Sequence, residues 1–467
     1  NLRLHPDLSQ QFPASGRSGG QHHIPSLPHN AHPVVLLFSI HPAAAFAGTL
    51  AILFVLLLAA YALPGERVRQ HVYDSARTIQ NEGLYPEYLG FKLFQMDNYT
   101  DTLMLFEAAS ADELPPLQAM MTNTAYNVDN FETLADDLAW YIEKDWSTGA
   151  QRTDAPALEP FSYARYWHGY LIWLRPLLLL MPYTGVRIVQ YIVLFALLAV
   201  VLVQLRRRCG LRAAVWFAVS QLAVSVWFVP HQVQYFTCFM IAYAGCAWVL
   251  AKPRRSDVLC LGLLVLGTAT AFCDLLVTPI ITLGLPLTCW LLEPQQRLRG
   301  GVPQCALAVG GSLCWGTGYA LCWAGKWALA GAVTNNNVLA DALHQAEVRT
   351  TADTWHGMEL TWRNIFIFLY DTLNSRHLFW PALAVLAVLI ALFILSIRSK
   401  TALVRALPLA LTTCMTPAWF VLLRTHSIQH GWFTWRALGL TVFAGLAFLY
   451  YACDLRAARR RLQKGSI

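Results

Sequence analysis

The sequence is poor in charge, and it has no cysteine arrangement typical of a disulfide framework or a zinc site. Asp, Glu, Lys and Arg together make up 13% of the chain, about half of the roughly 25% usual in soluble domains. That scarcity excludes an ordinary soluble globular protein. The 11 cysteines are scattered, without a CxxC pair or a Cys/His spacing that binds zinc. We interpret them as small apolar packing residues.

Apolar sequence is abundant instead, since 56% of the residues are hydrophobic. Runs of about 20 apolar residues recur, and each is long enough to cross a hydrocarbon core of roughly 30 Å. The runs are apolar on every side, which predicts helices and not alternating barrel strands. We therefore predict an all-α polytopic membrane protein with about ten transmembrane helices. Their approximate bounds are 43–63, 188–205, 213–229, 235–251, 257–273, 275–292, 304–324, 381–397, 406–423 and 437–453.

Basic residues form five clusters that follow alternate apolar runs, at 206–212, 252–255, 297–299, 398–405 and 456–464. The positive-inside rule predicts that all five lie in the cytoplasm, and ten spans then place both termini there as well. The net charge of +7 is explained as an orientation signal. A nucleic-acid partner is not expected.

The remaining sequence consists of tails and long loops around a single multi-span domain at 34–455. Residues 1–33 are rich in His, Pro, Ser, Gly and Gln, which predicts a disordered cytoplasmic tail. A basic cytoplasmic tail is predicted at 456–467. Two polar segments, 65–187 and 324–380, are expected outside the membrane, and the first holds most of the acidic residues. In the first we predict helices over Glu66–Glu82, Thr102–Ala111 and Asn130–Lys144, and a short interfacial or re-entrant helix over Leu171–Pro182.

The first polar group of interest, Asp97-Asn98-Tyr99-Thr100-Asp101, lies in the acidic outer segment. Asp97 and Asp101 are four residues apart and would share the first turn of a helix that begins near Tyr99. In one interpretation Asp97 or Thr100 caps that helix, where the dipole favours a carboxylate. In the other, a carboxylate binds metal or accepts a proton from an attacking hydroxyl. The sequence leaves both open.

A second group lies between the last two apolar runs, where His426 and His430 are four residues apart and Arg436 begins the final run. Two histidines and arginines beside aromatic residues suit a phosphate or pyrophosphate clamp at the headgroup level. An aromatic belt with snorkelling arginine explains the same residues. A zinc site is disfavoured because no third ligand accompanies the histidines.

The third group contains Arg165, His168 and Arg175 in a stretch rich in Tyr and Trp, and Asp274 lies at the outer end of the fifth apolar run. Arginine next to apolar sequence needs a partner, which favours binding of an anion such as a phosphate. A charge such as Asp274, bordered closely by apolar residues, is likewise a candidate for a binding site. The alternatives are an interfacial anchor for the aromatic stretch and a helix cap for Asp274.

One early span, a long acidic outer loop, many further spans and a later outer loop resemble the GT-C superfamily of membrane glycosyltransferases. That superfamily uses polyprenyl-phosphate-linked sugars, and the resemblance covers 43–453 in architecture. It implies that Asp97 is the catalytic base with Asp101 as its neighbour, and that outer Arg and His residues hold the lipid phosphate. It implies no certain cofactor, although some members need a divalent metal ion, which leaves one open at these two aspartates. The chain lacks the adjacent acidic pair that usually follows the first span.

The function implied is transfer of a sugar from a polyprenyl-phosphate donor to a cell-envelope glycan, lipid or protein. The reaction would take place on the outer face of a bacterial plasma membrane. A transporter or flippase of lipid-linked glycan precursors is the alternative, but transporters usually keep ionisable groups at the bilayer midplane. A scaffold without catalysis is a third. An enzyme would bring Asp97, Arg165, Asp274, His430 and Arg436 to one cavity, whereas a scaffold would leave them scattered.

Overall fold

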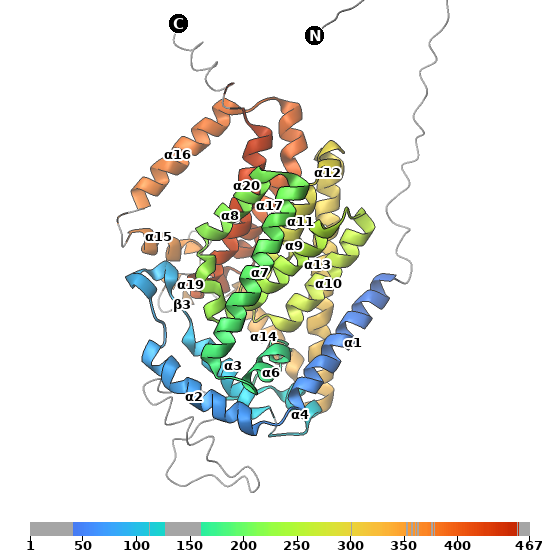
Figure 1. The fold of residues 1–467 in the computed structure, drawn as a ribbon, viewed down its shortest axis with the longest axis vertical. Coiled ribbons are helices and arrows are strands. Elements are labelled where there is room, and N and C mark those ends of the chain that lie inside the picture. The colour runs from blue at the N-terminus through green and yellow to red at the C-terminus, as the bar shows by residue number, and fades with distance from the viewer. Residues whose placement is uncertain are drawn as a thin grey trace, which may run out of the picture. The chain divides into compact units, whose positions relative to one another are not determined.

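The computed structural model describes a helical bundle (Figure 1). The contacts divide the chain into Asn1–Ile40 and His41–Ile467, and only the second unit is described here. The predicted tail at 1–33 and the predicted helix Asn130–Lys144 lie outside the described residues. The structure describes residues 41–111, 113–126, 160–299, 301–351, 354–355, 358–359, 361, 364–374, 377, 379–454 and 456.

In the described part of the chain, eight helical segments are long and apolar enough to cross a membrane. This confirms an all-α, multi-span protein, and each segment falls on one of the ten predicted runs. The long helices are α1 (His41–Tyr61), α7 (Tyr183–Cys209), α9 (Val233–Ala251), α10 (Ser256–Cys273), α13 (Gly301–Thr334), α16 (Phe379–Ser396) and α17 (Lys400–Leu422). The eighth segment, Gly431–Ala452, ends in α20 (Leu438–Ala452).

The two other predicted spans form shorter helices, α8 (Leu211–Ala223) and α11 (Ile280–Leu291). The predicted run 213–229 is interrupted at Ser225, whose φ of 57° ends α8. The chain continues as the 3₁₀ helix η5 (Val226–His231). In the predicted run 275–292, helix α11 starts only at Ile280, because Leu276 has φ 68° and Pro279 precedes the helix. A helix of 12 residues rises only about 18 Å. The predicted count of ten full spans is therefore not confirmed.

Close backbone contact joins α10 to α13, which lie side by side in Figure 1. A Cβ added at Gly267 would lie 2.0 Å from the carbonyl oxygen of Trp315, and one at Gly318 would lie 2.2 Å from that of Leu264. Small residues at a helix crossing let the two backbones approach closely, a common form of packing between membrane helices.

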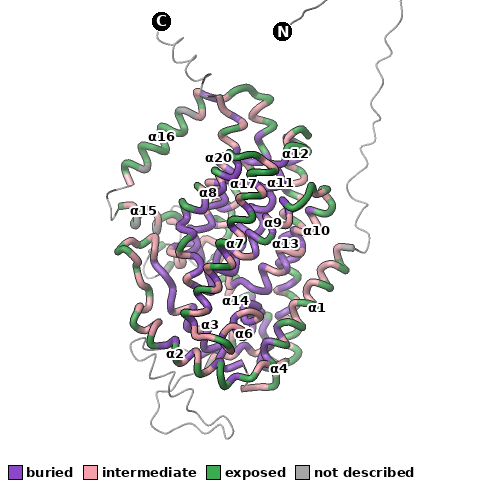
Figure 2. Tube along the Cα trace, viewed as in Figure 1, coloured by how far each residue is buried: buried purple, intermediate pink, exposed green. Residues whose placement is uncertain are grey.

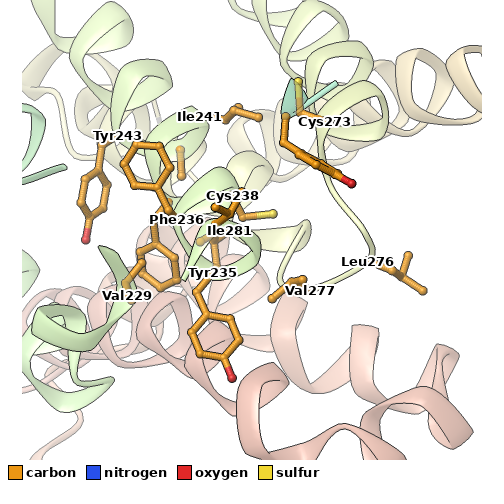
Figure 3. Close-up of a cluster of buried hydrophobic side chains, with 14 of the residues drawn as sticks. Val229, Tyr235, Phe236, Cys238, Ile241, Tyr243, Cys273, Leu276, Val277 and Ile281 are labelled. Atoms are coloured by element: carbon orange, nitrogen blue, oxygen red, sulfur yellow. The ribbon is translucent and has the colours of Figure 1, made fainter. Parts of the chain in front are cut away.

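The buried core follows α9 and α11, whereas α1 and α16 expose most of their surface (Figure 2). Figure 3 shows Phe236, Cys238 and Ile241 of α9 among buried apolar side chains that include Val277 and Ile281, near the start of α11. The exposed surfaces of α1 and α16 are apolar, as expected for helices that face lipid.

Four of the five predicted basic clusters lie together at one end of the bundle, which we call the basic end, whereas the predicted basic tail at 456–467 lies, apart from residue 456, outside the described residues. There Arg208 of α7 forms an ion pair of 2.7 Å with Glu293. The Arg297 guanidinium in the short helix α12 (Pro294–Leu298) donates to the hydroxyl of Tyr451 in α20. Trp290 of α11 donates to the carbonyl of Arg254 at 3.0 Å. The side of the membrane that this end faces remains the prediction of the positive-inside rule.

The described parts of the first polar segment, mostly helical, lie at the opposite end, which we call the polar end (Figure 1). The segment begins with α2 over Glu66–Glu82, the predicted range. The elements that follow are η2 (Tyr88–Gly90), η3 (Lys92–Phe94), α3 (Asn98–Ser110), α4 (Pro116–Thr122), β1 (Thr124–Tyr126), β2 (Pro160–Ser162) and α6 (Leu171–Leu178). Strands β1 and β2 pair antiparallel. Helix α6 begins at the predicted Leu171 but ends at Leu178, four residues before the predicted end. Helix α3 covers the predicted range 102–111 except its last residue and begins four residues earlier, at Asn98.

The second polar segment and the connection before α20 supply the other elements of the site. These are α14 (Val338–Thr351), β3 (Thr354–Trp355), β4 (Met358–Glu359), α15 (Ile367–Asn374), α18 (Arg424–Gln429), α19 (Gly431–Thr434) and the 3₁₀ helix η7 (Trp435–Ala437). Strands β3 and β4 pair antiparallel. Helix α14 packs against both α13 and α18, so residues far apart in the sequence meet at the polar end.

Candidate active site

A cavity of about 230 Å³ at the polar end brings together α3 and the segment before α20. We call it the acidic cavity. Helix α3 contributes Thr100, Leu103, Met104 and Glu107, spaced three and four residues apart on one helix face. The other lining residues are Tyr85, Asp97, Tyr99, Tyr163, Tyr170, Leu275, His430 and Trp432.

Asp97 both caps α3 and lines the acidic cavity, so both interpretations of this residue fit the structure. One carboxylate oxygen accepts from the backbone N–H of Thr100 at 2.9 Å, and the other accepts from the Thr100 hydroxyl at 3.0 Å. The residue is 3% exposed. Burial raises the pKa of Asp97 above its ordinary value, and the hydrogen bonds from Thr100 only partly oppose that rise. A carboxylate with a raised pKa is a better proton acceptor.

Glu107 is a second buried carboxylate on the same cavity, and the sequence interpretation did not select it. One oxygen lies 2.7 Å from Nδ1 of His168 and accepts a hydrogen bond from the Tyr170 hydroxyl. The other oxygen, buried on the cavity side of α3, has no partner within the described residues. Ten residues of helical rise separate Glu107 from Asp97, or about 15 Å. His168 does not line the cavity. Its contact with Glu107 holds that carboxylate in position.

Asp101 points away from the cavity and toward the start of α9. Its carboxylate accepts from the backbone N–H groups of Val233 and Gln234 at 3.3 and 3.4 Å, and from the Tyr183 hydroxyl. Asp97 stands at the cap position with non-helical backbone angles, which separates the directions of the two side chains. The structure therefore does not bring the two aspartates together.

Replacing Asp101 with Asn should flatten the dependence of stability on pH. Burial raises the pKa of Asp101 from 3.8 to about 7. The folded state thus holds a proton that the unfolded state releases between these values, and stability falls as pH rises through that window, by up to about 4 kcal/mol. Thermal unfolding in detergent at pH 5 and pH 8 should show this loss in the native protein and a smaller one in Asp101→Asn. An equal loss of stability between pH 5 and pH 8 in the two proteins would contradict the prediction.

Asp97 is held in place by a hydrogen-bonded network that includes the Glu82–Arg187 ion pair and the side-chain amides of Asn98 and Gln232. Both carboxylate oxygens of Glu82 bond the guanidinium of Arg187, at 2.6 and 2.9 Å. The Glu82 carboxylate also accepts from the side-chain amide of Asn98 at 3.2 Å. Gln232 accepts from the backbone N–H of Asp97 at 2.9 Å and donates to Asn98 at 2.8 Å. This network fixes α2, α3 and α7 around the start of α9. The buried Asn98 is inaccessible to N-glycosylation in the folded chain.

Glu82→Gln should destabilise the fold by about 1–3 kcal/mol, because it leaves the Arg187 charge without its bidentate partner. Glu87→Gln is the matched control, since Glu87 is exposed and lies five residues further along the chain. Unfolding midpoints of the two variants in the same detergent would measure the difference. Equal midpoints would show that the ion pair contributes nothing to stability.

The residues of the predicted phosphate clamp, His426, His430 and Arg436, do not form a cluster of positive charges. His430 lines the acidic cavity, and the ring of His426 lies 4.7 Å from it. Burial, with the nearby charge of Arg349, lowers the pKa of His430 to about 4, and burial also lowers that of His426. Both imidazoles are therefore neutral near pH 7. The Arg436 guanidinium is buried against the ring of Tyr235 and donates to the carbonyl of Trp432 at 2.8 Å, outside the cavity lining.

A second cavity of about 120 Å³ adjoins the first, and we call it the aromatic cavity. Leu276 lines it, whereas the preceding Leu275 lines the acidic cavity. The cations in its lining are Arg165 and Arg349. The Arg165 guanidinium lies 4.5 Å from the ring centre of Tyr163, which lines the acidic cavity, and 3.2 Å from a carboxylate oxygen of Asp341. The other lining residues are Tyr166, Tyr319, Trp323, Trp327, Ala342, Gln345, Ala346, Thr350, Trp419 and Leu423.

Two further candidates bond the backbone and do not line either cavity. The buried guanidinium of Arg175 donates to the carbonyls of Tyr61 and Leu63 at 3.2 and 2.9 Å, at the end of α1. The Asp274 carboxylate accepts from the backbone N–H of Val277 at 3.1 Å. Burial raises the pKa of Asp274 to about 6. The convergence of five residues expected of an enzyme is not met: Asp97 and His430 share one cavity, Arg165 lies in the next, and Asp274 and Arg436 lie in neither.

The residues that would hold a divalent metal do not fit one. The Asp97 carboxylate accepts from Thr100, whereas the Asp101 carboxylate accepts from Tyr183 and from the backbone N–H of Val233. Within the described part of the chain, no group of three His, Cys, Asp or Glu residues could hold a metal ion.

Comparison of the chain with models of known protein families, with curated proteins and with solved structures found no match. The function must therefore be inferred from the geometry and chemistry of the two cavities.

Proposed function

We propose that the protein is a membrane glycosyltransferase that moves a sugar from a polyprenyl-phosphate donor to a hydroxyl acceptor. The observation that carries the proposal is the pairing of two adjoining cavities at the polar end. One contains buried carboxylates, and the other contains two arginines among aromatic side chains. A base for the acceptor and a cationic, apolar site for a lipid phosphate are the two parts that this reaction needs.

The proposed reaction is a single displacement at the anomeric carbon of the sugar. The acceptor oxygen forms a bond to this carbon while the bond from the carbon to the phosphate oxygen breaks. The proton of the acceptor hydroxyl passes to the carboxylate of Asp97, and the electron pair of the broken bond leaves on the polyprenyl phosphate. Arg165 and Arg349 stabilise the negative charge that develops on that phosphate, as preorganised cations do in other transfer reactions.

Aromatic residues along α13 form a row of which the half-buried end, Trp323 and Trp327, is open to the lipid chain, whereas Trp315 and Tyr319 are buried. Trp315, Tyr319, Trp323 and Trp327 are spaced four residues apart, so they follow one face of the helix. Consecutive ring centres are 4.8, 5.2 and 5.8 Å apart. This row leads from the buried part of α13 to the cavity that holds the arginines. An unsaturated isoprenoid chain would bury apolar area against it while its phosphate stays at the polar end.

The proposed setting is the outer face of a bacterial plasma membrane, with both termini in the cytoplasm and a glycan, lipid or protein of the cell envelope as acceptor. The separation of polar and basic ends supports this orientation, because the basic clusters share the end remote from the two cavities. A transporter of lipid-linked glycan precursors remains the rival, and it differs in chemistry: it moves the lipid-linked sugar without breaking the bond to phosphate.

Purified protein in detergent, incubated with a panel of polyprenyl-phosphate sugars and acceptor glycans, tests the proposal. We expect release of polyprenyl phosphate with matching transfer of sugar to the acceptor, detected by mass spectrometry of both products. Intact donor after incubation with every member of the panel, combined with donor movement across reconstituted vesicles, would favour the transporter instead.

A further inference from the structure

The basic end contains a cationic cavity that the proposed reaction does not use. Two hollows of about 330 and 510 Å³ share Arg297, Arg398 and Tyr451 as lining residues. We treat them as one site, the arginine cavity. The first hollow adds Arg405, Ser399 and the amides of Gln296 and Gln304, and the second adds Arg212, Trp216 and Tyr450.

No carboxylate lines either hollow among the described residues. Arg297 and Arg212 donate instead to the phenols of Tyr451 and Tyr450, the second at 2.6 Å, and Arg398 donates to the carbonyl of Cys453. The buried Nε of Arg297 has no partner in the described part of the chain. The adjacent acid, Glu293, is buried and already paired with Arg208 at 2.7 Å. The cations therefore keep donor capacity for an anion from outside the chain.

Tyrosine rings and hydrogen bonds hold three of the arginines, Arg212, Arg297 and Arg398, in place. Tyr451 lies under the Arg297 guanidinium at 5.0 Å, and Tyr450 lies under those of Arg212 and Arg398 at 5.1 and 5.9 Å. Arginine–aromatic contacts of this kind restrict the guanidinium to one region.

Helix α17 begins in the wall of the same cavity. Its cap residue, Ser399, lines the cavity and accepts from the backbone N–H of Ala402 at 3.1 Å. The positive end of the 23-residue helix thus faces the same space as the arginines. A Cβ at Gly301 would lie 1.7 Å from the carbonyl oxygen of Val404, so α13 closes tightly on this first part of α17. The cavity is therefore built from fixed backbone as well as side chains.

We propose that the arginine cavity binds a phosphate-bearing anion, and that this binding is separate from the transfer reaction. A role in membrane orientation alone explains why basic residues lie at this end. It does not require Arg297 of α12 and Arg398, just before α17, to line both hollows, each of which contains one further arginine. Arginine forks and a helix N-terminus are the usual protein partners of phosphate.

Two sources of the phosphate are chemically equivalent at this site, a lipid headgroup of the adjacent leaflet and a free phosphorylated solute. Exposed apolar side chains favour the lipid, since Leu211, which lines the second hollow, is 62% exposed and Leu298, next to Arg297 in sequence, is 87% exposed. The probes are dihexanoyl phosphatidylglycerol and inorganic phosphate, each titrated calorimetrically into the full chain in a neutral detergent. Saturable binding of the first identifies a lipid headgroup, and binding of the second alone identifies a solute. Absence of saturable binding for both would overturn the proposal.

The test variant is Arg297→Gln/Arg398→Gln, and we expect its dissociation constant to rise about 100-fold, roughly tenfold for each charge-assisted contact. The matched control, Arg255→Gln/Arg299→Gln, removes the same charge from two exposed residues at the basic end outside the cavity. We expect less than a twofold change there. Equal weakening in both pairs would overturn the proposal, because it would show that only the overall charge matters.

A second variant decides the question if the double substitution fails to fold. Thr401→Glu keeps every arginine and places a carboxylate on an exposed position of the cavity wall. We expect the dissociation constant to rise at least tenfold, with an unchanged elution volume and unfolding midpoint. Unaltered binding by this folded variant would contradict the assigned site.

Discussion

Asp97→Asn is expected to lower the rate of sugar transfer by about 10²–10⁴-fold, the usual contribution of a general base. Asparagine preserves the shape of the residue and its ability to cap α3, since its side-chain oxygen still accepts from the backbone N–H of Thr100. It does not take the proton of the acceptor hydroxyl. Release of polyprenyl phosphate from a fixed concentration of donor measures the rate, and the unfolding midpoint should stay close to that of the native protein.

Two further substitutions show whether the loss belongs to Asp97 itself. Asp101→Asn removes a carboxylate of the same helix that faces α9 and not the cavity, so transfer should persist in the folded variant. Glu107→Gln removes the other carboxylate of the acidic cavity. Full transfer by Asp97→Asn, together with loss in Glu107→Gln, would move the role of base to Glu107.

The fold was largely predictable because apolar length and charge placement are local properties of the sequence. The range of α2 was predicted without error, and each long apolar run is helical. The predicted lengths of α8 and α11 were wrong because single residues interrupt the apolar runs 213–229 and 275–292. Ser225 and Leu276 adopt positive φ, which composition does not reveal. Burial then permits α11 to be short, since its polar ends are covered by protein and not by lipid.

The site was less predictable, because spacing along the chain does not determine where a side chain points. Asp97 and Asp101 are separated by one helical turn in sequence, yet the cap geometry of Asp97 sends the two carboxylates to different surroundings. Glu107 carried one usable signal, an acid directly after the apolar run 103–106, which needs buried partners.

The roles of the buried cations were equally hard to predict from the sequence. Arg175 and Lys326 both bond backbone carbonyls, at the ends of α1 and α4. A buried cation that satisfies a helix C-terminus looks the same in sequence as one that awaits a phosphate. Arg349 was not selected because it lies in an ordinary polar helix. Only the packing of α14 against α13 and α18 brings it to the aromatic cavity.

Arg165→Gln/Arg349→Gln should raise the KM for the lipid-linked donor and lower kcat, with a combined loss in kcat/KM of about 100-fold or more. Each charge-assisted hydrogen bond to phosphate is worth about 1.5–3 kcal/mol, and tenfold corresponds to about 1.4 kcal/mol. The effect reaches kcat because the phosphate gains charge as it leaves. Initial rates at varied donor concentration, with the acceptor saturating, separate the two parameters. Arg165→Lys/Arg349→Lys should recover part of the loss, since it restores charge without the bidentate geometry.

Asp341→Asn is the matched control, because it changes the charge beside Arg165 in the opposite sense. Asp341 bonds the Arg165 guanidinium at 3.2 Å and is exposed, so its removal frees the cation for a donor phosphate without emptying the aromatic cavity. If Arg165 binds the phosphate, this variant keeps or lowers the KM for the donor while the double arginine variant raises it. A rise in KM of similar size in both would mean that Arg165 orders α14 through its ion pair. The phosphate would then have to be held by other groups.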